Sequence, residues 1–131
     1  MVEIVVRPVA LGFQFAVFDP DAPGAYPAWD TGEERLVVTS AGMAIATDTD
    51  EEIVIRVRVL GSGEGMAEPE TWQRIGFGRV STREGRFEVG CVLAATTRQL
   101  VVEAGAYDVI ASRNRALATD FLVEVRRSEG V

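Results

Sequence analysis

Short runs in which apolar and polar residues alternate recur along this chain, and they limit its fold more than any other feature of the sequence. The clearest run covers 52–60, EIVIRVRVL, where alternate branched residues from Ile53 to Val59 share one side and two arginines lie on the other. Successive side chains of a β-strand point to opposite faces, so this pattern predicts a strand with one face in a core. A 3.6-residue period is not sustained anywhere, and we expect at most one helical turn near 113–118.

About nine or ten such runs are separated by glycine, proline and polar turns. We expect strands over 2–6, 13–18, 35–39, 43–47, 52–60, 72–82, 86–94, both sides of Gly105 within 100–112, and 120–127. Within the second run, Phe13, Phe15 and Val17 are expected to share one face of the strand. The pattern predicts one all-β domain covering 1–131, built as a two-sheet β-sandwich or jelly roll, with a closed small β-barrel as the alternative.

The turns between these strands carry further expectations. In 100–112, LVVEAGAYDVIAS, Gly105 separates two apolar runs. It predicts either a late hairpin or a tight corner between two strands, because glycine adopts a positive φ without steric cost. The strands at 72–82 and 86–94 are expected to pair as a hairpin across the turn between them. Glycines within 72–82 favour a bulge, a bend or a close approach of the two sheets.

The composition excludes several kinds of chemistry. The chain has no histidine, and all 13 of its basic residues are arginine. Ser-His-Asp and Cys-His catalysis and a Schiff-base lysine are therefore excluded within one chain. The one cysteine, Cys91, has no disulfide partner and is expected to be a small buried side chain. We expect a protein that is not an enzyme, with no catalytic residues, no cofactor and no metal centre. Without a secretion signal or a membrane-spanning run, a cytoplasmic location is expected.

Negative charge is concentrated in one part of the sequence. The net charge is -7, to which 19–70 contribute twelve acids and three arginines, whereas 71–131 hold seven acids and nine arginines. This asymmetry predicts an acidic patch that attracts a basic protein and counts against direct binding of nucleic acid or an anionic membrane. The expected partner-binding residues are Asp19, Asp21, Tyr26, Trp29, Asp30, Asp48, Asp50 and Glu51.

Other interpretations of the same residues stay open. Trp29 is also typical of an aromatic side chain that closes one end of a core, and the carboxylates can be scattered over the surface. The acids at 48–52 offer oxygen ligands for calcium, although they lack the glycine and spacing of an EF-hand loop. Paired aspartates would also suit a carboxylate-dependent hydrolase, but all of them lie in turns, where aspartate caps its own backbone.

The order of elements resembles the family of competence protein J, the DNA-entry nuclease inhibitor of naturally transformable bacteria. The likeness is carried by FQFAVFD at 13–19, the loop with Trp29, EAGAYDVIA at 103–111 and TDFLVEV at 119–125, whereas the GSGEG loop at 61–65 departs from the family. The resemblance implies a bacterial, non-enzymatic β-sandwich that binds and blocks a nuclease or a similar toxin. It assigns no functional residue, and homo-oligomer formation stays open.

A second class of function is the binding of a small ligand. It requires a concave apolar pocket with a few convergent polar groups. Trp72, Tyr107, Arg56 and Arg58 are the candidates for such a pocket.

Overall fold

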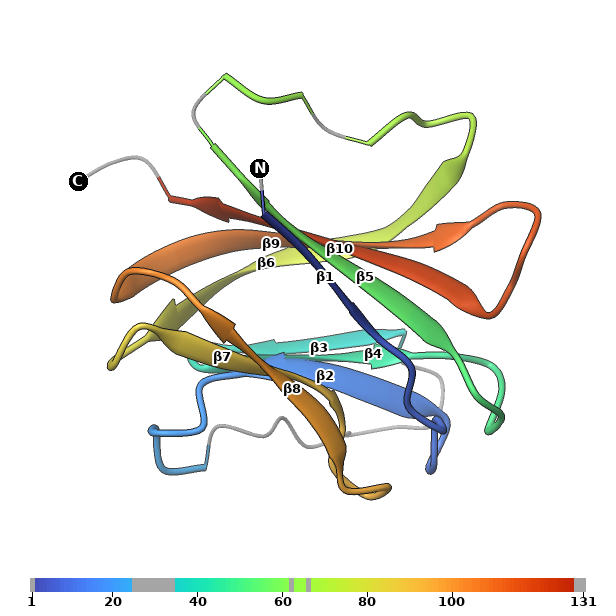
Figure 1. Ribbon diagram of the computed structural model, residues 1–131, viewed down its shortest axis with the longest axis horizontal. Helices are drawn as coiled ribbons and strands as arrows, with labels where there is room; N and C mark the ends of the chain where they lie inside the picture. Colours follow the sequence, from blue (N-terminus) through green and yellow to red (C-terminus); the bar gives the residue numbers. More distant parts are fainter. Residues whose placement is uncertain (1, 25–34, 62, 66, 129–131) are drawn as a thin grey trace.

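Ten β-strands form two stacked sheets in the computed structural model, which describes residues 2–24, 35–61, 63–65 and 67–128 (Figure 1). The first sheet contains, from edge to edge, β1 (Val2–Val6), β5 (Val54–Leu60), β10 (Asp120–Arg127), β9 (Gly105–Asn114) and β6 (Trp72–Thr82). The second sheet contains β3 (Leu36–Thr39), β4 (Gly42–Ala46), β2 (Gln14–Phe18), β7 (Arg86–Cys91) and β8 (Thr96–Val101). The predicted all-β sandwich is confirmed, and the sheets do not close into the alternative barrel.

Alternate residues of both sheets fill the space between them. Ile53, Ile55 and Val57 are fully buried, as the alternation in their run predicts. The core also holds two edge-to-face aromatic pairs, one of which joins Phe15 of the second sheet to Phe121 of the first at 5.2 Å between ring centroids. Such pairs add about 0.5–1.5 kcal/mol to the stabilisation that comes from burial itself.

Strand pairing is antiparallel throughout, except that β5 and β10 run parallel at the centre of the first sheet. In the connection from β5 to β6, the described residues 63–65 and 67–71 lie over the outer face of this sheet (Figure 1). Leu122 and Glu124 are buried on the outer face of β10, and Ala67 of this connection donates a hydrogen bond to the Glu124 carboxylate. The first sheet therefore has a covered outer face at its centre.

Two turns are corners between the sheets rather than hairpins within one sheet. β8 belongs to the second sheet and β9 to the first, so Gly105 lies at a corner, where its φ is 142°. The tight corner expected at this glycine is confirmed, and the alternative hairpin is wrong. The expected hairpin of β6 with β7 is also wrong, because β6 pairs with β9 and β7 pairs with β2 and β8.

Strand β6 contains the predicted irregularity. Its register with β9 shifts between Arg74 and Gly76, which marks a bulge. Beyond the bulge a Cβ on Gly78 would lie 2.5 Å from Val38 of the facing sheet. The glycines therefore permit the close approach of the two sheets.

No helix forms among the described residues, and none of them belongs to a helix that could cross a membrane. In place of the expected helical turn near 113–118, the side-chain oxygen of Asn114 accepts hydrogen bonds from the backbone N–H groups of Ala116 and Leu117. Asparagine stabilises turns through such bonds to its own local backbone.

Replacing Gly78 with alanine tests the close approach. We expect Gly78→Ala to lower the free energy of unfolding by about 1–3 kcal/mol, because Val38 and Met43 must shift to admit the new methyl group. Gly65→Ala is the matched control, since nothing lies within 4 Å of a Cβ at Gly65. Urea unfolding of both variants measures the difference. Equal stability of the two variants would contradict the proposed sheet contact.

Candidate functional site

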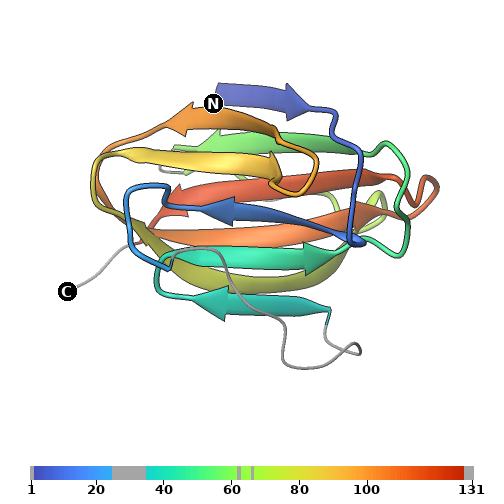
Figure 2. The same cartoon turned by 90° about the horizontal axis from the view of Figure 1, so that it is seen from below.

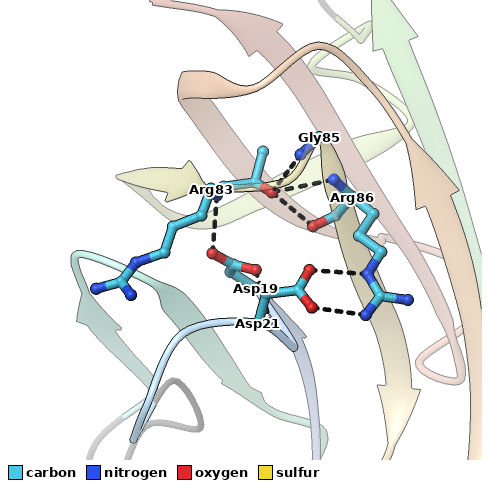
Figure 3. A network of polar contacts seen from close by, with 6 residues as sticks. Asp19, Asp21, Arg83, Gly85 and Arg86 are labelled. Atoms are coloured by element: carbon cyan, nitrogen blue, oxygen red, sulfur yellow. Dashed lines mark hydrogen bonds and ion pairs between the residues drawn. The ribbon is translucent and has the colours of Figure 1, made fainter.

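Asp19 lies at the end of β2 and is almost completely buried, with 1% of its surface exposed. Its carboxylate accepts the backbone N–H groups of Asp21, at 3.0 Å, and Arg83, at 2.9 Å (Figure 3). A buried carboxylate is stabilised when such donors replace its lost hydration. Asp19 thereby ties the end of β2 to the corner between β6 and β7.

Asp21 forms the second half of this corner contact. It binds Arg86 in a bidentate pair, with Nε and Nη2 at 2.8 and 2.7 Å from its two carboxylate oxygens (Figure 3). The hydrogen bond from Arg86 lowers the pKa of Asp21 below its usual 3.8, and the same contact raises the pKa of Arg86. The hydroxyl of Thr82 accepts the backbone N–H groups of Gly85 and Arg86 and closes the turn. These contacts explain why β6 and β7 meet at a corner.

Asp48 lies at the opposite end of the sandwich. The backbone N–H of Asp19 bonds to Ala41 at the β3–β4 turn, whereas the N–H of Thr47 bonds to the carbonyl of Phe13 at the start of β2. The acids at 19 and 21 therefore do not share a patch with Asp48, Asp50 and Glu51. The other three predicted residues, Tyr26, Trp29 and Asp30, lie outside the described residues.

The carboxylate of Asp48 bridges Arg35, which directly precedes β3 of the second sheet, and Arg113 on β9 of the first sheet. It accepts a hydrogen bond from Arg35 and another, at 2.9 Å, from Arg113. The Arg35 contact, followed by that of Arg113, lowers the pKa of Asp48 below its usual value of 3.8. Asp50 and Glu51 are exposed beside it. Within the described part of the chain, no three acidic or cysteine side chains are placed so that they could hold a metal ion.

Three loops meet at this end of the sandwich, which lies at the right in Figure 2: 7–13, 47–53 and 92–95. The first two are joined by backbone hydrogen bonds, from Ala10 N–H to Glu51 and from Ile53 N–H to Pro8, both at 2.9 Å. The third packs on the first, since a Cβ on Gly12 would lie 2.8 Å from Leu93. Segments far apart in the sequence thus form one continuous surface.

Apolar side chains are exposed on this surface. Phe13 is 53% exposed and Leu93 is 62% exposed, although large apolar residues are normally found in the core. Six of the ten exposed large apolar residues in the described ranges lie in loops at this end: Val9, Leu11, Phe13, Val92, Leu93 and Leu117. Phe13 was expected on the same face of the strand as Phe15 and Val17, and this is wrong for Phe13, because Phe15 and Val17 are buried in the core whereas Phe13 is exposed.

The backbone is strained at the same end. In the described ranges, three residues other than glycine have a positive φ: Phe13 at 59°, Asp48 at 60° and Ala95 at 54°. For a bulky residue such as phenylalanine this conformation is a genuine outlier. Strained residues of this kind persist where the surrounding structure holds them, and they cluster at functional sites.

We call Leu11, Phe13 and Leu93, together with Asp50 and Glu51, the loop-end surface. It has an apolar centre and acidic neighbours, an arrangement that resembles the apolar core and polar rim of protein interfaces. Sequence reasoning identified its acids but missed its apolar part. Phe13 fits the alternation of its strand, and only the positive φ that follows Gly12 turns it outward.

A small β-sandwich with an apolar, acid-flanked loop end is the class of protein that this geometry defines. No family model and no curated protein sequence matches the chain. Its fold is similar to that of ComJ from Bacillus subtilis, an inhibitor of the DNA degrading activity of NucA, at 11% identity and a TM-score of 0.70 over 98% of this chain and 96% of that one.

It is also similar to the structure of crocagin biosynthetic gene J, at 15% identity and a TM-score of 0.58 over 98% of this chain and 100% of that chain. Identities this low establish a shared fold alone. The predicted resemblance to competence protein J is confirmed at that level.

Removal of the Asp48 charge tests the bridge between Arg35 and Arg113. Asp48→Asn keeps a residue that tolerates positive φ, and we expect it to lower the free energy of unfolding near pH 7 by about 0.5 kcal/mol, since exposed ion pairs contribute little. Because folding lowers the pKa of Asp48, its stabilisation is present above about 3.8 and is lost as the pH falls through the folded-state value.

Urea unfolding of the wild type and of Asp48→Asn as a function of pH measures this effect. The difference between them should disappear at acidic pH, whereas Asp50→Asn, at a neighbouring exposed acid, should match the wild type throughout. A difference that does not shrink as the pH falls below about 3.8 would contradict an ionic origin, because protonation of the Asp48 carboxylate removes its ion pairs.

Proposed function

We propose that the chain is a non-enzymatic interaction protein that binds a cationic nuclease through its loop-end surface and inhibits it. The observation that carries this proposal is the exposure of Phe13 and Leu93 at the same end of the sandwich as Asp50 and Glu51, where backbone hydrogen bonds join loops 7–13 and 47–53 and Leu93 packs on Gly12. Burying the apolar side chains supplies affinity, and the acids steer a basic partner and select for it.

The charge and the fold support this proposal from two sides. The net charge of -7 favours a basic partner. It counts against nucleic acid as the direct partner, because a protein that binds nucleic acid needs a basic face for the phosphate backbone. The similar fold of ComJ belongs to a protein that inhibits DNA degradation. An acidic protein surface is suited to a nuclease because the site that receives DNA phosphates is itself basic.

The predicted acids take two different parts in this proposal. Asp50 and Glu51 lie on the loop-end surface, and Asp48 positions their loop through its two arginines. Asp19 and Asp21 stabilise the corner at the other end, where their carboxylates bind groups of the chain itself. We therefore place the contact with the partner at the loop end.

The test is a DNA degradation assay with purified protein. The nucleases are NucA and any nuclease encoded beside this gene in its own genome. We expect an equimolar amount of the protein to suppress degradation by at least one of them. Unchanged degradation by all of these nucleases in the presence of excess protein would overturn the proposal.

Substitution of Phe13 locates the contact. Phe13→Asn removes the apolar ring and keeps a residue that adopts positive φ readily, so we expect normal stability and inhibition weakened by about tenfold or more. Phe77→Asn is the matched control, because Phe77 is 67% exposed but lies on β6, away from the loop end. Equal loss of inhibition in the two variants would contradict this location.

Salt tests the contribution of the acids. Raising the ionic strength from about 0.1 to about 1 M shortens the screening length from about 10 to about 3 Å, so binding to the nuclease should weaken. We expect a smaller salt effect for the double variant Asp50→Asn, Glu51→Gln. Titration of binding at several salt concentrations measures it, and an identical slope for the wild type and the double variant would exclude these two acids from the interface.

A further inference from the structure

A cavity of about 240 Å3 lies on the outer face of the first sheet, next to Ala67 and Pro69 of the connection between β5 and β6. It is separate from the loop-end surface. Its walls bring together a carboxylate, two guanidinium groups, a hydroxyl and apolar surface. The residues that carry these groups are Glu124, Arg74, Arg115, Ser112, Trp72 and Ile110.

Glu124 is the unusual group in this cavity. It lies on the central strand β10 and is 3% exposed. Among the described residues its hydrogen-bond partner is the backbone N–H of Ala67, at 2.9 Å from one carboxylate oxygen. Glutamate is almost never buried unless it is paired with a cation, because burial removes the hydration of its charge. A single neutral donor replaces only a small part of that hydration.

The arginines nearest to Glu124 in the sheet have other partners. Arg58 is its direct neighbour on β5, but it donates to Glu3 at 2.8 Å. Arg126, two residues along β10, donates to the carbonyl of Glu64. No ion pair to Glu124 within 4.0 Å occurs in the described ranges, so the carboxylate faces the cavity without a cation of the chain bound to it.

The opposite charge lies on the cavity wall. Arg74 is exposed on β6 and forms no ion pair with any described residue. Arg115 donates its Nε to the carbonyl of Pro69 at 2.7 Å, which holds the guanidinium at the cavity while its other N–H groups remain available for a ligand. Guanidinium groups favour carboxylate ligands, to which they can donate two parallel hydrogen bonds.

We propose that this cavity binds a free amino acid, with the ammonium group of the ligand at Glu124 and its carboxylate at Arg74 and Arg115. Such a ligand supplies the cation that Glu124 lacks and the anion that the arginines lack. Trp72 and Ile110 provide apolar surface for its side chain. The volume lies slightly below the about 300–1,000 Å3 of pockets for drug-sized molecules, which suits a compact ligand.

The alternative is that Glu124 only holds the connection 61–71 on the sheet through Ala67. Glu124→Gln separates these roles, because the amide oxygen still accepts the Ala67 N–H while the charge is lost. A structural role predicts no binding of amino acids and little change in Glu124→Gln. A ligand site predicts binding that depends on both charges of the amino acid.

The experiment is an NMR titration of the isotope-labelled full chain with each of the common amino acids at up to about 10 mM, well above a Kd of about 1 mM. We expect at least one of them to shift the amide signals of residues that line the cavity. N-acetylation or amidation of that amino acid should each weaken binding by about tenfold or more, because each removes one charge. No shift with any amino acid would overturn the proposal.

Variants complete the test. Glu124→Gln and Arg74→Gln should each weaken binding about tenfold or more, whereas Arg79→Gln, on the same outer face, should leave it unchanged. Unchanged binding in both cavity variants would overturn the assignment. If Glu124→Gln fails to fold, Arg74→Gln and the two ligand derivatives decide. Asp50→Asn changes the loop-end surface and should bind the amino acid normally. Failure of the amino-acid proposal can therefore be distinguished from failure of the nuclease-inhibition proposal.

Discussion

Burial of the inner faces of the two sheets is the interaction on which the rest of this structure depends. Phe15 and Phe121 lie on the middle strands of their sheets, and their edge-to-face contact joins the sheets at the centre. Full burial of one such side chain contributes about 1.5–3 kcal/mol, whereas an exposed ion pair contributes about 0–1 kcal/mol. The core therefore holds the sheets face to face, and the strand ends are free to carry loops with other tasks. Polar contacts act where the chain crosses between the sheets, as Asp19 does at the corner between β6 and β7.

The two ends of the sandwich use their acids differently. At one end Asp21 is bound to Arg86, and Asp19 is buried among backbone donors. At the other end Asp50 and Glu51 are exposed beside apolar side chains and a strained backbone. Exposed apolar groups and backbone strain both cost stability, and a protein retains them where they serve a purpose other than folding. This contrast between the ends is the physical reason for placing a partner at the loop end.

Local alternation was enough to predict most strands and the core, since a period of two decides which side of a strand is buried. It predicted the buried face shared by Ile53, Ile55 and Val57. The corner after Thr82 was mistaken for a hairpin turn, because a short glycine-containing turn looks the same whether the next strand joins the same sheet or the opposite one. The loop-end surface depends on the strand order, including the parallel pairing of β5 with β10, for which no local signal exists. The burial of Glu124 was equally hidden, since a glutamate in an alternating strand is typical of a wet face until a distant loop covers it.

The loop-end surface and the cavity next to Ala67 and Pro69 lie on different faces, so one molecule of the protein has room for both ligands. The hairpin loop between β9 and β10 lies near both. Its Arg115 lines the cavity, and its Leu117 is exposed at the same end of the sandwich as the loop-end surface. The hydrogen bond from Arg115 to the carbonyl of Pro69 joins this hairpin loop to the connection over the cavity.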